Sequence, residues 1–231
     1  HLFQGYYFAH PTILSGRKLG QSRLSLLKLL SQVLDDSDTP QLEQTFKHEP
    51  GLSINLLRMA NSAAVGARTR ITSLRHTITL LGRRQLQRWL QLLLYTDPAG
   101  NTGFPPLLQL AATRARLLEL LAESHMAADR DFADRAFMTG ILSLTPALFA
   151  TPIDEILSQI STLATDVKQA LLRHQGSLGL LLRLIEALES EDLSQVPALV
   201  AQLPGLSPER VNLAQAQALA WTRAIGQEQQ N

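Results

Sequence analysis

The stretch HEPGLSINLLRMANSAAVGARTRITSLRHTITLLG, residues 48–82, decides the fold, because turn signals and apolar residues follow one another in it at fixed spacing. Steps of three and four place an apolar stripe on one helix face. The stripe consists of Leu52, Ile54, Leu56, Leu57 and Ala60. It stops at Asn61 and Ser62, and Gly66 follows as a permissive left-handed stop. The pattern therefore predicts a short helix and a tight turn.

A second helix is predicted directly afterwards. Ser73 is a suitable N-cap, and Gly82 ends the helix. Its apolar positions step by four and three, at Leu74, Ile78 and Leu81. We expect Asn61, Ser62, Gly66 and Gly82 to cap and turn the chain. Ligand contact by Asn61 or Ser62 is the alternative.

Composition sets broad limits on function. The 231 residues are 45% hydrophobic, which is typical of a globular protein, and they include no cysteine. Disulfides and thiolate metal sites are thereby excluded. No apolar run approaches the roughly 20 residues that span a bilayer, and no signal peptide opens the chain. We expect a cytoplasmic protein without membrane contact.

The periodicity predicts an all-α fold. No segment shows convincing period-two alternation, and the Gly- and Pro-rich stretch 96–106 separates two helical subdomains at about 20–95 and 104–226. The piece between Pro146 and Pro152 is expected to be turn-rich. Further helices are expected at 22–34, 39–48, 83–95, 107–125, 131–144, 153–159, 166–173, 178–189, 196–203 and 208–226.

In the helix expected at 107–125, one side collects apolar residues and a single arginine. These residues are Leu107, Leu110, Ala111, Arg114, Leu117, Leu118 and Leu121.

The opening stretch resembles the first half of an HDOD domain, a helical bacterial signalling module related to the HD phosphohydrolases. The matching residues are Pro50, Leu52, Ser53, Leu56, Leu57, Arg58, Ala60, Asn61, Ser62, Ala63, Gly66, Ile71, Ser73, Leu74, Ile78, Leu81 and Gly82. A second segment, 171–181, resembles the Arg-x-Gly-x-x-Gly-x-Leu-Leu pattern of HDOD proteins attached to EAL domains. Its glycines are expected to allow close helix approach.

The first residues extend this resemblance. Residues 3–11, FQGYYFAHP, are similar to the final strand of an EAL domain, the cyclic-di-GMP phosphodiesterase fold. We therefore expect residues 1–11 to be an EAL remnant and 12–231 to be the HDOD domain of a longer protein, since the chain starts at His1. The alternative for Leu2–Gly5 is the scar of a protease site.

The HDOD resemblance also directs attention to one metal-binding position. Catalytic HD domains hold metal with an upstream His, an adjacent His-Asp pair and a later Asp, and in HDOD proteins the pair follows an A-F-x-x-G-L-L stretch. Residues 136–142 match that stretch, but the next two residues are Ser143 and Leu144. Leucine has no ligand atom, and a neutral hydroxyl is a poor substitute for imidazole. We expect no catalytic residue, no metal and no cofactor.

One feature points to a binding surface. The segment between Gly51 and Thr96 holds seven arginines and no acidic residue. Because the whole chain carries +1, the remainder sums to −6. Such asymmetry can mark an anion-binding or acidic-partner surface, or only a solvated helix face. The candidate residues are Arg75, Arg83, Arg84 and Arg88.

These features together lead us to expect a non-catalytic bacterial signalling module that acts by protein contact, with an upstream EAL domain among its partners. One alternative is a divergent metal-dependent HD phosphohydrolase with relocated ligands. The other is a module that binds a cyclic dinucleotide or nucleic acid through its arginines, although few aromatic residues lie among them.

Overall fold

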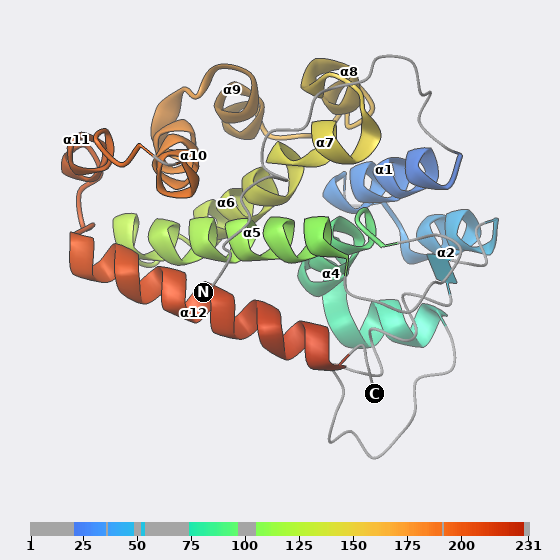
Figure 1. The fold of residues 1–231 in the computed structure, drawn as a ribbon. Helices are drawn as coiled ribbons and strands as arrows, with labels where there is room; N and C mark the ends of the chain where they lie inside the picture. The colour runs from blue at the N-terminus through green and yellow to red at the C-terminus, as the bar shows by residue number, and fades with distance from the viewer. Residues whose placement is uncertain are drawn as a thin grey trace.

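The computed structural model describes residues 21–35, 37–48, 52–53, 74–96, 105–190 and 192–228, and in this part of the chain every regular element is a helix (Figure 1). The all-α prediction is therefore confirmed. The helices are α1 (Gln21–Leu34), α2 (Thr39–Lys47), α4 (Leu74–Leu93), α5 (Pro106–His125), α6 (Arg130–Ser143), α7 (Thr145–Phe149), α8 (Ile153–Ser158), α9 (Thr165–Arg173), α10 (Gly176–Glu189), α11 (Val196–Ala201) and α12 (Pro208–Glu228).

Helix α5 organises the fold. It crosses the middle of the molecule and packs against α6, α10 and α12, with α12 running along its lower side in Figure 1. Its buried residues occupy more than one face, which is why a single amphipathic stripe does not describe it. They are Leu108, Ala111, Ala112, Arg114, Ala115, Leu117, Leu118, Glu119, Leu121 and Ala122.

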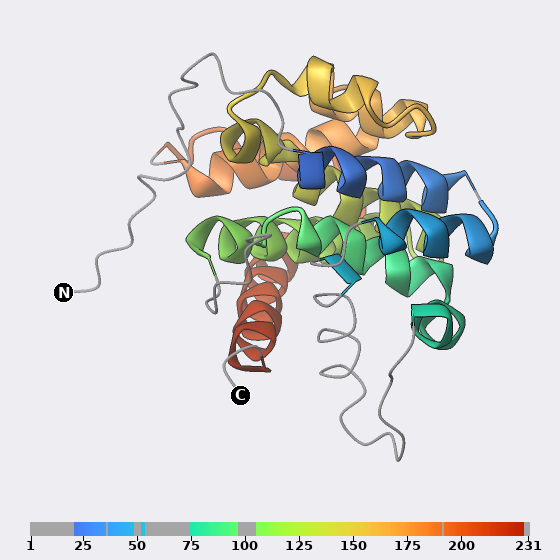
Figure 2. The ribbon, with the colours of Figure 1, turned by 90° about the vertical axis from the view of Figure 1, so that its right-hand side faces the viewer.

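The start of α2 and the bend of α4 follow local rules. Asp38 lies at the N-cap of α2 with Pro40 in the first turn, although the Asp38 side chain makes no capping hydrogen bond. Gly82 has φ 71° and ψ 167° inside α4, a conformation that glycine alone adopts readily. Helix α4 is consequently two helical segments with different directions, and Figure 2 shows its first turns end-on.

The interpretation of the piece between Pro146 and Pro152 as only turn-rich is wrong. Residues Thr145–Phe149 form α7, a short helix with Pro146 in its first turn. Proline is favoured at this position because its missing N–H would have no partner within the helix anyway. Ala150 then ends α7 in the left-handed conformation, with φ 50°.

Contacts join the two predicted subdomains. The Arg23 guanidinium of α1 donates to the Leu148 carbonyl at 3.1 Å, and the Thr162 hydroxyl donates to the Ser31 carbonyl at 3.1 Å. One hydrophobic core cluster includes residues from both sides, such as Leu30 and Ile156. The two predicted subdomains therefore share one hydrophobic core on either side of 96–106.

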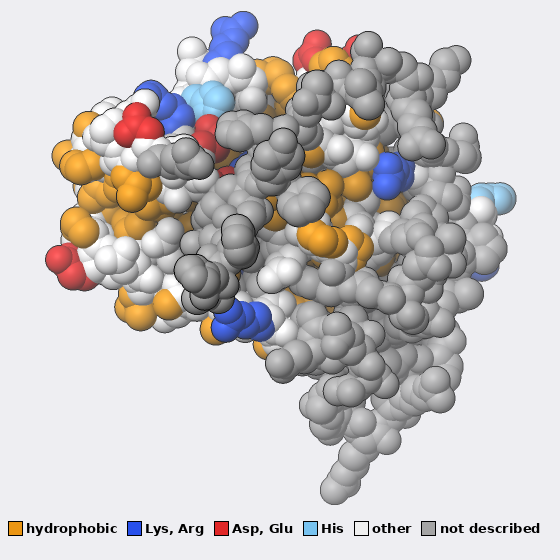
Figure 3. Space-filling model, viewed as in Figure 1, with side chains coloured by type: hydrophobic (Ala, Val, Ile, Leu, Met, Phe, Trp, Pro, Cys, Tyr) orange, Lys and Arg blue, Asp and Glu red, His pale blue; other side chains and the backbone are white. Residues whose placement is uncertain are grey.

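Figure 3 shows exposed hydrophobic side chains gathered over α10, α11 and α12. The most exposed large ones in this region are Leu193, Leu213 and Leu219. No helix within the described ranges is both long and apolar enough to cross a membrane.

Candidate functional site

Ser143 and Leu144, the two positions singled out by the HDOD resemblance, lie at the end of α6. Residues 136–142 are all buried there, and α6 ends at Ser143. Leu144 is 4% exposed and belongs to the hydrophobic core. The Ser143 hydroxyl donates to the Gly140 carbonyl at 2.8 Å, a bond within the same helix. Neither side chain is free to serve as a metal ligand.

A buried arginine lies beside Ser143, and we call the place where the two meet the centre. Arg114 of α5 is 5% exposed, and its Nη1 donates to Ser143 Oγ at 2.9 Å. Its Nε donates to Glu189 Oε1 at 3.0 Å, while Nη2 pairs with Glu189 Oε2. The planar guanidinium thus grips the carboxylate through two parallel bonds, which is the strong geometry for an ion pair. Helices α5, α6 and α10 meet at this triad of Arg114, Ser143 and Glu189.

The backbone explains how Arg114 reaches Ser143. A methyl group added at Gly140 would lie 2.5 Å from the Ala115 Cα atom, so only glycine lets α6 approach α5 this closely. The Arg114 side chain leaves α5 at that crossing, and Ser143 follows Gly140 by three residues, within the next turn. Gly140 therefore accounts both for the close packing of α5 and α6 and for the hydrogen bond from Arg114 to Ser143.

The residues at this centre do not fit a metal ion. Its carboxylate, Glu189, is already bound by Arg114 through both oxygens, and a second cation beside a guanidinium would be repelled. Nowhere among the described side chains do three or more His, Cys, Asp or Glu residues gather closely enough to hold a metal. His125 turns to the carbonyl of Pro204, with 2.8 Å between Nδ1 and the oxygen.

Tyr95 closes the same region from α4's C-terminal side. Its hydroxyl donates to the Ile141 carbonyl at 2.5 Å, and the side chain is 3% exposed. Burial raises the pKa of the Tyr95 hydroxyl well above its usual range, although the Arg114 cation works against this. A neutral tyrosine therefore anchors the chain after α4 to α6.

Three of the four candidate arginines have described side chains, and all three contact the chain itself. Arg83 donates to the Ser37 carbonyl. Arg84, half exposed, pairs with Asp134 and donates to the Arg130 carbonyl at 3.3 Å. The side chain of Arg75 lies outside the described residues.

Arg88 faces inward. Its guanidinium pairs with Glu119 of α5, lies 3.9 Å from Asp134 of α6 and stacks over the Phe137 ring at 4.4 Å. Burial lowers the pKa of Arg88, and Asp134 counteracts that effect. Glu119 also pairs with Arg116. Part of the positive charge predicted for a partner is thus neutralised by acids from the second half of the chain.

The motif residues are only partly described. The Ser53 hydroxyl donates to the Phe46 carbonyl at 2.9 Å, and Gly82 makes the bend of α4. Five further motif residues, Pro50, Asn61, Ser62, Gly66 and Ser73, lie outside the described residues.

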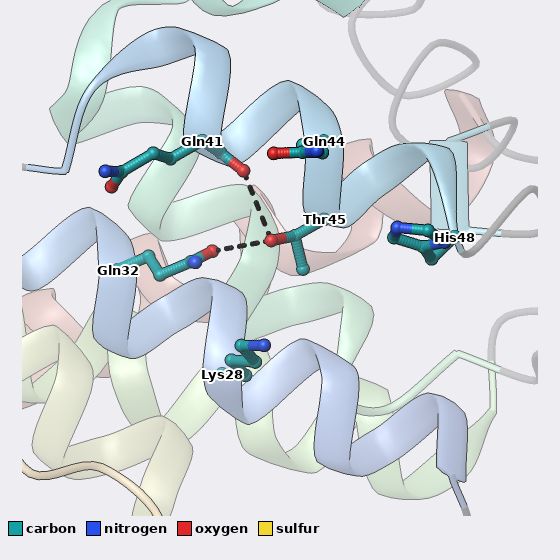
Figure 4. Close-up of a pocket in the computed structure, with 6 residues that line it drawn as sticks. All are labelled: Lys28, Gln32, Gln41, Gln44, Thr45 and His48. Carbon is teal, nitrogen blue, oxygen red and sulfur yellow. Dashed lines mark hydrogen bonds between the residues drawn. The ribbon is translucent and has the colours of Figure 1, made fainter.

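A polar cleft that the sequence did not indicate lies between α1 and α2 (Figure 4). It measures about 260 Å³, and it is lined by Lys28, Gln32, Gln41, Gln44, Thr45 and His48. The Thr45 hydroxyl lies 3.1 Å from Gln32 Oε1 and 3.2 Å from the Gln41 carbonyl oxygen. Most of its lining residues are exposed, as expected for a solvated seam between two amphipathic helices.

The described helices form an all-α domain in which Arg114, Ser143 and Glu189 meet at the end of α6. A family model described as the HDOD domain matches residues 20–186, and the chain belongs to that family.

Two relatives extend the match beyond the family model. The chain is 30% identical over 225 residues to the cyclic di-GMP phosphodiesterase CdgJ of Vibrio cholerae, covering 96% of this chain and 51% of that protein. It is 29% identical over 205 residues to the uncharacterized protein YuxH of Bacillus subtilis, covering 87% and 49%. The chain thus spans about half the length of the curated relatives it matches. No solved structure gives a significant match.

Proposed function

We propose that the chain is a non-catalytic HDOD signalling module, C-terminal to an EAL domain, which acts by protein contact in bacterial cyclic-di-GMP signalling. The observation that carries the non-catalytic part is the triad at the end of α6. Ser143 is bound to Arg114, Leu144 is buried in the core, and Glu189 is engaged by the same arginine. None of these three residues is left to activate water or hold a metal.

The link to cyclic-di-GMP is supported by the relatives and by the first residues. CdgJ is named for phosphodiesterase activity, and residues 3–11 resemble the end of an EAL domain. Because the match covers 51% of CdgJ, the activity in its name need not lie in the matched half. We therefore propose that the parent's EAL domain is the first partner of this module.

For the contact surface we propose Arg75, Arg83 and Arg84. Arg88 belongs to the same predicted set, but its internal ion pairs mean that replacing it would damage the fold. Arg84 is the best-suited residue for mutation, because half of its side chain is exposed. Exposed charges chiefly tune the association rate and its salt dependence.

The test measures binding of the chain to the separately purified EAL domain of its parent. We expect a complex that weakens as salt rises, and that Arg84→Ala weakens by about threefold. Arg173→Ala, at the exposed end of α9, is the matched control and should bind like wild type. Absence of any complex would refute this choice of partner.

Catalysis is tested separately. Tag-free chain is incubated with cyclic-di-GMP and with a nitrophenyl phosphodiester, each in the presence of Mn²⁺, Mg²⁺ or Zn²⁺. We expect no hydrolysis above buffer. Metal-dependent turnover that copurifies with the chain would instead establish the alternative, a divergent HD phosphohydrolase.

A further inference from the structure

We propose that the guanidinium of Arg114 serves as a resident cation that replaces a metal ion at the junction of α5, α6 and α10, so that this scaffold is held together without metal. The inference rests on the non-catalytic function proposed above. Beyond the lack of catalysis, it gives Arg114 a structural role, since the same guanidinium that occupies Glu189 also holds the three helices together.

Arg114 connects three helices through its side chain and backbone. A metal ion in such a scaffold would bind side chains from separate helices and fix their distances. Arg114 does the same with N–H donors. It holds Ser143 of α6 at 2.9 Å and Glu189 of α10 at 3.0 Å, while its own backbone belongs to α5.

Both charged side chains of the pair are largely buried. Arg114 is 5% exposed, and the Glu189 side chain is 14% exposed. Each charge has been removed from water and depends on the other for compensation. The pair is therefore strongly coupled, unlike Arg135 and Asp166, which are joined at 2.8 Å but have side chains 31% and 45% exposed. This second pair is a matched control within the same chain.

The pair lies where three helices meet. Gly140 brings α6 into backbone contact with α5 beside Arg114, and Glu189 is the last residue of α10. An ion pair at this place fixes the position of the C-terminal end of α10 relative to α6. The shape that the module presents to a partner then becomes independent of the metal supply of the cell.

The test is a double-mutant cycle read by thermal unfolding, with Arg114→Met, Glu189→Met and the double variant. Each single change leaves a buried charge unpaired, and we expect its Tm to fall by roughly 10 °C. The double variant should recover most of that loss, because a buried pair can be replaced by apolar groups at little cost. The same cycle at Arg135 and Asp166 should show shifts of about 2 °C or less and little coupling.

A second measurement concerns the metal itself. Wild-type chain should show an unchanged Tm with EDTA and with equimolar Mn²⁺ or Zn²⁺, and metal analysis of dialysed protein should show none bound. If a single variant fails to fold while the double variant folds, the coupling is confirmed. Additive losses in the cycle, failure of all three variants to fold, or a metal-dependent rise of the wild-type Tm would each overturn the proposal. None of these readouts depends on partner binding, so the proposed function can fail independently.

Discussion

At the scale of single residues, Gly140 makes the centre possible. Helix propensity alone would favour alanine over glycine inside α6 by about 1 kcal/mol. The structure predicts the opposite sign, because the new methyl group would lie 2.5 Å from the Ala115 Cα and 2.8 Å from its nitrogen. We expect Gly140→Ala to lower the free energy of unfolding by about 2–3 kcal/mol, measured by urea denaturation.

Gly176 provides the control for this prediction. It has φ 72°, and nothing would lie within 4 Å of a methyl group added at this position, so only backbone strain opposes alanine there. Gly176→Ala should cost about 1 kcal/mol. Equal losses in the two variants would mean that the crossing of α5 and α6 is looser than described.

Tyr95 leads to a prediction about pH. Its hydroxyl donates to the Ile141 carbonyl, so Tyr95→Phe should cost about 1 kcal/mol at pH 8. Burial raises the pKa of Tyr95 in the folded state, so between pH 10 and 12 only the unfolded state ionises and the folded state loses stability by about 1.4 kcal/mol per pH unit. Phenylalanine has no such loss, and the variant should match wild type near pH 11.

Urea unfolding at pH 8 and pH 11 tests this sign. Other titrating groups are common to both proteins and cancel in the difference. A gap that stays constant with pH would show that Tyr95 ionises as readily in the folded state as in the unfolded one, and a widening gap that it ionises more readily there; either would contradict the prediction.

The sequence contains a signal for Arg114 that helix periodicity alone does not interpret. The residue stands in the apolar stripe of 107–125, where a solvated arginine is out of place. What periodicity cannot supply is its partner, because Glu189 lies 75 residues away. Ser143 and Leu144 can be singled out from local sequence because they directly follow a motif. The contacts of Arg114 with Ser143 and Glu189 cannot, because they depend on the packing of three helices.

At the scale of elements, helix positions followed from local patterns and helix contacts did not. The expected segments 107–125 and 131–144 correspond to α5 and α6 within one residue at each end. Because their segment lacks acids, the sequence leaves two readings for the arginines of α4, a partner surface or a solvated helix face. The acids that pair with Arg84 and Arg88 come from α6 and α5, and such long-range pairing cannot be read from the sequence of a single helix.

Glu119 of α5 joins α5 to α4 through its ion pair with Arg88. Its side chain is 5% exposed and pairs with Arg88 and Arg116. Glu119→Gln would leave Arg116 without this carboxylate and Arg88 with only Asp134 at 3.9 Å, and we expect a loss of about 3 kcal/mol, or roughly 6–12 °C in Tm. Glu123, one turn later and exposed, is the control, and Glu123→Gln should change stability by less than about 0.5 kcal/mol. Similar shifts in both melting curves would argue against the inward role of Arg88.

At the scale of the whole molecule, the contacts between the two predicted subdomains suggest joint unfolding. Arg23 bonds to Leu148, Tyr95 bonds to Ile141, and Arg88 pairs with Glu119 across the division at 96–106. The hydrophobic core runs through both parts. A domain with such shared burial is expected to unfold in one cooperative transition.

The two tryptophans of the chain allow a direct test. Trp89 lies in α4 and reports on the first part, whereas Trp221 lies in α12 and packs edge-on against Phe137, with 6.1 Å between ring centroids. Trp221→Phe and Trp89→Phe each leave one reporter. We expect each variant to show the same urea midpoint by its own fluorescence as by circular dichroism of the whole chain.

Two separate midpoints would show that the predicted subdomains unfold independently. The contacts across 96–106 would then contribute little free energy, and a partner could separate the two parts at small cost. Coinciding midpoints mean instead that a change in the stability of α4 also changes the stability of α12, because the two helices share one core. A signal received by this module would then have to move helices as one packed body, or act through its effect on the stability of the whole domain.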